Sequence, residues 1–251
     1  MLISGRSQAQ ESRYQRAKLS RISRRYNSAI AREINRAMNE AAKKIGEPLA
    51  SEQVRAKHGE KLTGILTRLW TEAGYTAATS TFKIAKSFLQ MEFKKDITTP
   101  IIDNAIAGWI KAFGGTQITE ITQTTMSEIN EIVADARVEG LSERETAQLI
   151  YAVAPTKSAS RSQTIARTEA HGSSQGISLD VANQTDIPMR KVWISDKSST
   201  ARDTHLRING QERALSEDFD VDGEKLRYPG DSSGSAKNVI NCKCVIGYVV
   251  A

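Results

Sequence analysis

Cysteine and long apolar runs are scarce in this sequence. The 251 residues include two cysteines, Cys242 and Cys244, which stand one residue apart and are therefore too close for an ordinary mutual disulfide. We expect them to be thiols or metal ligands. No apolar stretch approaches the roughly 20 residues that a membrane-spanning helix needs, and the N-terminus lacks the apolar core of a secretory signal. These absences favour a protein of the cytosol over a membrane protein or a disulfide scaffold.

Positive charge is concentrated at the N-terminus. Residues 1–50 hold 11 Lys and Arg against 4 Asp and Glu, while the net charge of the whole chain is +6, so the excess lies in this segment. A basic segment attracts nucleic acid or an acidic protein surface. The alternative is an ordinary solvated helix face. The candidate residues for nucleic-acid or partner binding are Arg16, Arg21, Arg24, Arg25, Arg32 and Arg36.

Apolar residues recur every three or four positions through the first 185 residues, which predicts helices. The clearest stripe includes Ile22, Ile30 and Ile34. The expected helices cover approximately residues 7–45, 51–90, 98–113, 116–140, 142–155 and 158–185. Gly114 and Pro155 are expected to end helices. The fifth helix begins with a capping box, whose Ser142 and Glu145 have the required spacing.

The pattern changes after Pro188. Residues 191–194 and 244–250 read as strands, and residues 221–223 and 228–231 read as turns. The sequence therefore predicts an α+β fold, in which a predominantly helical N-terminal body precedes a small mixed α/β C-terminal domain. We place the change of character near residue 186.

His205, Cys242 and Cys244 are the candidate metal ligands. Two thiolates and an imidazole suit Zn²⁺, although the spacing is not that of a zinc finger or ribbon. Asp203 and Asp196 are the candidates for a fourth ligand. The alternative is that the cysteines are small buried apolar residues. We expect no cofactor, with zinc as the one exception.

The same histidine could serve acid/base chemistry with Asp203, Asp196 or Asp231. The sequence offers no recognisable nucleophile motif and no phosphate-binding loop. We therefore favour a structural His205, which holds irregular backbone through hydrogen bonds, and no enzymatic activity.

Five other residues have roles suggested by residue type. Arg167 and Glu169 stand two apart on a helix, so they do not face each other, and each is expected to pair elsewhere, with the C-terminal domain. Trp193 is expected in the core of that domain. Arg190 and Lys191 could contact nucleic acid through charge alone.

The order of polar signatures in the last part of the chain resembles the Mu F-like minor head proteins of tailed phages, also called phage head morphogenesis proteins. The resemblance covers approximately residues 140–250 and includes the helix start at residues 141–145. The signature residues that carry it are Arg167, Thr168, Glu169, Trp193, Asp203, His205, Asn209, Gly210, Pro229, Gly230, Asp231, Asn241, Cys242 and Cys244.

The resemblance implies a division into a helical region, residues 1–139, and a Mu F-like minor head domain, residues 140–251, whose small α+β part is residues 186–251. It also implies a structural protein of the virion, present in few copies in the head interior near the portal and made in the host cytoplasm. Its expected partners are the portal protein, the major capsid or scaffold protein, and double-stranded DNA, with no membrane in the assembled particle. The alternatives are a metal-dependent hydrolase or nuclease using His205, Asp203, Cys242 and Cys244, and a DNA-binding protein delivered with the genome.

Overall fold

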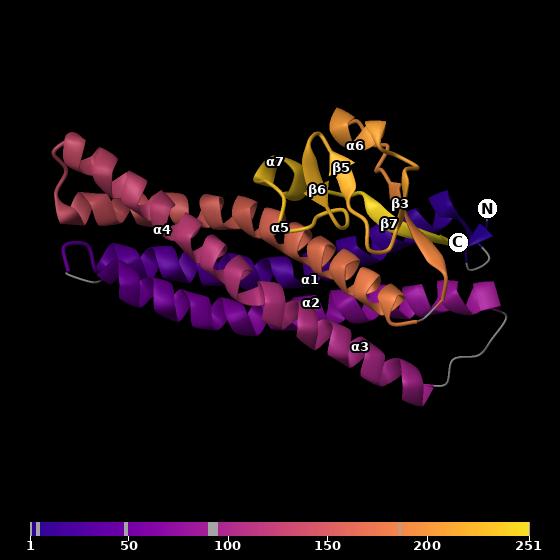
Figure 1. Ribbon diagram of the computed structural model, residues 1–251. Coiled ribbons are helices and arrows are strands. Elements are labelled where there is room, and N and C mark those ends of the chain that lie inside the picture. The colour runs from indigo at the N-terminus through magenta and orange to yellow at the C-terminus, as the bar shows by residue number, and fades with distance from the viewer. Residues whose placement is uncertain (1, 4–5, 48–49, 90–94, 186, 251) are drawn as a thin grey trace. The chain divides into compact units, whose positions relative to one another are not determined.

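The computed structural model describes residues 2–3, 6–47, 50–89, 95–185 and 187–250. Long helices form the N-terminal body, and the strands β3 to β7 gather in the C-terminal region (Figure 1), which confirms the α+β class. No helix among these residues is both long and apolar enough to cross a membrane. The helices are α1 (Gln8–Lys43), α2 (Ala50–Leu89), α3 (Lys95–Trp109), the π-helical turn η1 (Ile110–Gly114), α4 (Gly115–Val138), α5 (Glu143–Asn183), α6 (Asp203–Arg207) and α7 (Ala236–Val239). The strands are β1 (Leu2–Ile3), β2 (Arg6–Ser7), β3 (Met189–Ile194), β4 (Glu212–Ala214), β5 (Phe219–Val221), β6 (Glu224–Leu226) and β7 (Val245–Val250).

The chain forms two compact units, neither of which is continuous in sequence. Unit 1 comprises Met1–Ser23, Leu69–Ala112 and Arg167–Ala251, and unit 2 comprises Arg24–Arg68 and Phe113–Ala166. The predicted division into residues 1–139 and 140–251 follows the extent of the family resemblance, and it stays a prediction. Residues 90 and 186, where a helix end and a change of character were expected, lie outside the described residues.

Two of the predicted helix ends are wrong. Helical structure passes from η1 into α4 at Gly114 without a break, and Pro155 lies inside α5. A proline removes one backbone donor from a helix, but burial on one face outweighs that loss here. Buried residues recur every fourth position across the proline, which is itself exposed, so packing continues in register on both sides. These buried residues are Ile150, Ala154, Ser158 and Ser162.

Unit 2 has a helical core that confirms the apolar stripe of the first helix. Ile30 and Ile34 are fully buried. A buried polar pair links α1 to α2, because the His58 Nδ1 atom lies 3.1 Å from the Glu33 Oε1 atom. The helix α5 is fastened to α4 by Arg161, which donates to the Thr125 Oγ1 atom at 2.8 Å. The predicted capping box is present: the Ser142 N–H donates to the Glu145 Oε2 atom at 2.8 Å, and the Glu145 N–H to the Ser142 Oγ atom at 3.3 Å.

Unit 1 contains an antiparallel sheet of order β4-β3-β7. The β3–β7 register pairs Met189 with Val250 and Ile194 with Val245. A separate hairpin joins β5 to β6 through Asp222 and Gly223, whose φ angles of 57° and 85° are those of a tight hairpin turn. The turn at residues 221–223 is thus where the sequence predicts it. A short hairpin, β1 with β2, lies where no strand was expected.

Two apolar clusters organise the C-terminal part of unit 1. The first joins α2 and α5 to the sheet and includes Ile84, Leu179 and Tyr248. The second surrounds the fully buried Trp193. Phe219 lies edge-on to Trp193 at 5.3 Å between ring centroids. The two cysteines belong to this second cluster, which fixes them beside the sheet.

Candidate functional site

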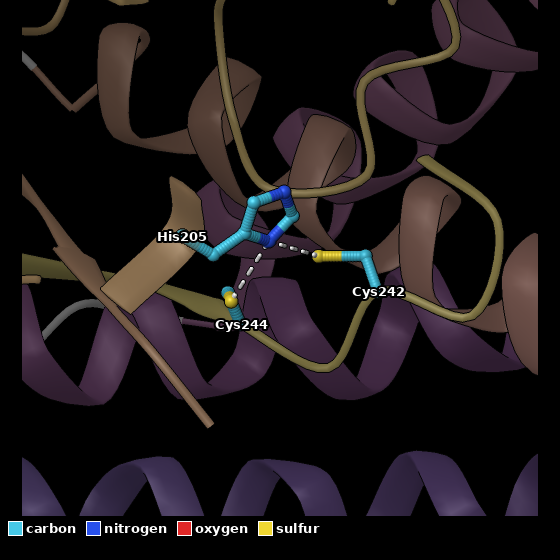
Figure 2. A group of neighbouring side chains, drawn as sticks. All are labelled: His205, Cys242 and Cys244. Carbon is cyan, nitrogen blue, oxygen red and sulfur yellow. Dashed lines mark hydrogen bonds between the residues drawn. The ribbon is translucent and has the colours of Figure 1, made fainter. Parts of the chain in front are cut away.

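His205, Cys242 and Cys244 meet inside the small α+β part of unit 1 (Figure 2). The His205 Nδ1 atom lies 3.7 Å from the Cys242 Sγ atom and 3.4 Å from the Cys244 Sγ atom. The three donor atoms lie within 4.8 Å of one another, and all three residues are buried. The structure therefore brings together the three metal-ligand candidates. Along the chain, His205 stands 37 positions before Cys242 and 39 positions before Cys244.

Backbone contacts and a ring contact position the histidine. His205 lies on the short helix α6, and the Ser195 hydroxyl, just after β3, donates to its backbone carbonyl. The Trp193 ring stands nearly perpendicular to the imidazole, at an interplanar angle of 87° and a centroid distance of 5.3 Å. These contacts aim the Nδ1 atom at the sulfurs. Among the described residues, the other ring nitrogen, Nε2, has no hydrogen-bond partner.

The two thiols lie on the short segment between α7 and β7, and they differ in their acidity. Cys242 donates a hydrogen bond to Cys244, and this bond together with burial raises the pKa of Cys242. The same bond lowers the pKa of Cys244 against the opposing effect of burial. His205 and the backbone N–H of Asp196 also form hydrogen bonds with Cys244 that lower its pKa. The pair thus favours a thiolate on Cys244, which is the form that binds metals. Both cysteines are free of disulfides.

A pocket of about 280 Å³ lies beside this cluster. Cys242 lines it together with the buried His171 of α5. Burial lowers the pKa of His171 to about 4, and the ring forms a hydrogen bond with the backbone of Cys244. Three cationic side chains also line the pocket, so it favours anions or water over apolar molecules. They are Arg16, Arg167 and Lys243.

The Arg-Thr-Glu signature on α5 holds two other parts of unit 1. Arg167 donates to the Asn241 side-chain oxygen at 3.1 Å, and the Asn241 N–H donates to the Thr168 hydroxyl at 3.1 Å. Asn241 has a φ angle of 57°, so these bonds stabilise an unusual backbone conformation directly before Cys242. Glu169 points elsewhere and accepts a bond from the Trp70 indole at 2.9 Å. Arg167 and Glu169 thus have separate partners.

Asn209 and Gly210 fasten the loop after α6. The Asn209 side chain accepts a bond from the Ser195 N–H at 2.9 Å, and the Gly210 N–H donates to the Trp193 carbonyl at 2.8 Å. Gly210 has a φ angle of 82°, a conformation that glycine adopts without strain. The loop therefore holds the end of β3, next to the residues that position His205.

Asp231 organises the turn that contains Pro229 and Gly230. Its carboxylate is fully buried and accepts bonds from the backbone N–H, Nε and Nη2 atoms of Arg227, at 2.9, 2.7 and 2.6 Å. Burial opposes the charge, but the Arg227 contacts hold the pKa of Asp231 below its usual value. The buried Pro229 and Gly230 bring the turn against α5, where a Cβ on Gly172 would lie 2.9 Å from the Gly230 carbonyl.

Three candidate roles do not agree with the geometry. Asp203 is exposed on α6, and neither it nor Asp196 joins the ligand group among the described residues. Lys191 is buried and donates to the Leu215 and Arg227 carbonyls at 3.1 and 2.8 Å, so it is turned away from any nucleic acid. A sequence shows the charge of a lysine but not its burial. The burial of Lys191 is therefore visible only in the structure.

Gln175 and Ser178 of α5 are contacts that no sequence motif marks. The Gln175 side chain accepts a bond from the Ile246 N–H at 2.7 Å, and Ser178 lies 2.9 Å from the Tyr248 hydroxyl. Ser178 also lies 2.8 Å from the Thr81 hydroxyl of α2. The available signal was the run of small and polar residues at positions 171–178, which interrupts the apolar stripe of a predicted helix.

These features define a helical protein with a small α+β region whose loops are fastened by buried polar contacts. Residues 127–247 match the family described as Phage Mu protein F like protein. The matched region is therefore similar to the Mu F-like phage proteins, a family of structural proteins associated with head morphogenesis. The resemblance predicted from the order of the motifs is confirmed. Comparison with curated proteins and with solved structures gives no match.

Proposed function

We propose that this protein is a minor head protein of a tailed phage, which associates with the portal, enters the procapsid during assembly and contacts the packaged DNA. The observation that carries the proposal is the Mu F-like match over residues 127–247. That region contains the small α+β part, whose loops are held by buried hydrogen bonds. Loops held in this way suit a protein with a fixed place in a particle. Its partners are the portal and the capsid or scaffold protein.

The exposed arginines of α1 support contact with DNA. Arg21, Arg24, Arg25 and Arg32 are exposed along this helix. Arg16 and Arg36 are less exposed than these four. Arg36 pairs with Glu33 and Glu40 at 2.6 and 2.9 Å, and Arg16 contacts Ser12 at 3.1 Å and Asp196 at 3.8 Å. By exposure, the DNA-binding role falls on four of the six candidate arginines.

Replacing these four arginines by glutamine tests the DNA contact without removing the helix. Deleting residues 1–50 would instead remove the buried Ile30, Ile34 and Met38, so loss of incorporation would not distinguish misfolding from lost contact. For the full chain and double-stranded DNA, the quadruple variant should weaken binding at low salt. It should also reduce the slope of log K against log salt by up to about 4, at roughly 0.9 per phosphate contact.

A matched variant removes four exposed cations from α2 and α5, namely Arg55, Lys61, Lys83 and Arg144. It changes the net charge equally, so it should retain most of the DNA affinity if α1 is the contact. Equal affinities for the two variants would reject a DNA role for α1. Incorporation of both variants into heads, measured by immunoblot of purified particles, separates DNA binding from portal association.

A hydrolase that uses His205 with Asp203 as a catalytic pair is not supported by the geometry. Asp203 is exposed on the first turn of α6, whereas the ring of His205 is buried with its Nδ1 atom toward the two sulfurs. A helix turns by roughly 100° per residue, so positions two apart face different sides. We therefore assign His205, Cys242 and Cys244 no part in the proposed head function.

A further inference from the structure

The group formed by His205, Cys242 and Cys244 has the dimensions of a metal site. In a tetrahedral zinc site, bonds of about 2.3 Å to sulfur and about 2.05 Å to nitrogen place the sulfur and nitrogen atoms about 3.6 Å apart. The two S···N distances here are 3.7 and 3.4 Å. A metal ion can thus enter among the three donors with little movement of the protein.

The orientation of the three side chains agrees with these distances. Figure 2 shows one nitrogen of the His205 ring turned toward both sulfurs, while the other nitrogen points away from them. Cys242 and Cys244 approach that nitrogen from the same short segment, so a single ion can contact all three. The donor types, two thiolates and one imidazole, are those that Zn²⁺ prefers.

The surrounding residues hold the donors as outer contacts of a metal site do. The Ser195 hydroxyl, just after β3, donates to the backbone carbonyl of His205. Trp193 fixes the plane of the imidazole, and Thr168 with Arg167 fixes Asn241, next to Cys242. These contacts come from α5, β3 and the loop after β3, so the geometry of the donors does not depend on one loop.

A fourth ligand can come from the pocket that Cys242 lines. No fourth His, Cys, Asp or Glu joins the group within the described ranges. The pocket measures about 280 Å³, which leaves space for a water molecule. His171 lines the same pocket, and its Nε2 atom is buried without a hydrogen-bond partner among the described residues, so it can accept a bond from that water.

We propose that this chain binds one Zn²⁺ ion through the His205 Nδ1, Cys242 Sγ and Cys244 Sγ atoms, with a water molecule as the fourth ligand. The site joins α6 to the segment before β7, a connection that Arg202, the residue before α6, also makes by donating to the Ile240 carbonyl. Zinc therefore stabilises the small α+β part. The proposal does not depend on the role in the phage head.

Metal content of the full chain tests the proposal directly. The reduced protein is loaded with Zn²⁺, desalted and measured by elemental analysis, and one zinc ion per chain is expected. Cys242→Ser, Cys244→Ser and His205→Gln should each lose most of the zinc. His58→Gln is the matched control, because it replaces a buried histidine outside the ligand set, and it should retain the zinc.

Two measurements on the unaltered chain keep the proposal testable if the variants misfold. Replacement of zinc by Co²⁺ should give sulfur-to-cobalt charge-transfer absorption with the intensity of a four-coordinate ion. Zinc should also protect both thiols from alkylation, and a chelator should remove that protection and lower the melting temperature. Folded wild-type protein that takes up neither Zn²⁺ nor Co²⁺ would overturn the proposal and leave the three residues as a hydrogen-bonded cluster.

Discussion

Asp231 is a fully buried carboxylate whose charge is balanced by Arg227. Asp231→Asn removes that charge and leaves the bonds from Arg227 and Ser233 incompletely matched. We expect the free energy of unfolding to fall by about 2–3 kcal/mol, toward the lower end of losses for broken buried pairs because Arg227 can reach water. Urea denaturation measures this change. Asp220→Asn is the control, because it disrupts an exposed pair with Lys225 and should cause a much smaller loss.

The same carboxylate has a pH signature. Its pKa in the folded protein is lower than the usual 3.8, so its contribution to stability is complete above the unfolded pKa and disappears as pH falls through the folded pKa. The difference in unfolding free energy between wild type and Asp231→Asn should therefore shrink below about pH 4. A difference that stays constant down to acid unfolding would contradict the assigned pairing.

Lys191 should show its pH dependence in the alkaline range. Burial lowers its pKa from 10.5 to about 8, against the attraction of Asp218 and Asp231, so the folded protein loses this proton before the unfolded chain does. The destabilisation caused by the buried charge is complete below pH 8 and disappears as pH rises toward 10.5. Urea denaturation of wild type and Lys191→Met should show wild type gaining relative stability across this window. Parallel curves would show that Lys191 is solvated like an exposed lysine.

The helix α5 is an element whose burial the sequence could not predict. Residues 171–179 are all buried, so this stretch has no polar face and no period of 3.6. Periodicity identifies a helix with one side in water, and it fails where a helix is enclosed. The glycines at 172 and 176 weaken helix propensity, and they are present because the Tyr228 turn and Trp109 approach the backbone there.

Gly176→Ala tests that account of α5. The added Cβ would lie 2.5 Å from the Trp109 Nε1 atom and 2.8 Å from the Tyr228 hydroxyl, so the substitution should destabilise the protein by about 1–3 kcal/mol, in the range of overpacked cores. Gly64→Ala on α2 is the matched control. Its Cβ meets nothing within 4 Å, so it should raise the melting temperature through a gain of about 0.5–1 kcal/mol in helix propensity. Similar effects of the two substitutions would contradict the close approach at Gly176.

At the scale of the whole molecule, the sequence predicts the fold class and most helices. A single apolar stripe, such as that of α1, indicates both the helix and its buried face. It does not predict the two discontinuous units, which arise from contacts between residues far apart in the chain. For the site, residue types mark His205, Cys242 and Cys244 as candidates, but spacing alone does not show that they meet. Asp203 is exposed and Lys191 is buried, and charge in a sequence does not reveal which side chains face inward.

The central proposal is that this chain, whose residues 127–247 match the Mu F-like family, is a minor head protein at the portal. Imaging of procapsids with and without this protein, at a resolution that separates the portal vertex from the other vertices, tests that claim most directly. The account predicts extra density inside the head at the portal vertex, in few copies, which disappears when the chain is absent. Identical procapsids, with the chain missing from purified particles, would contradict it.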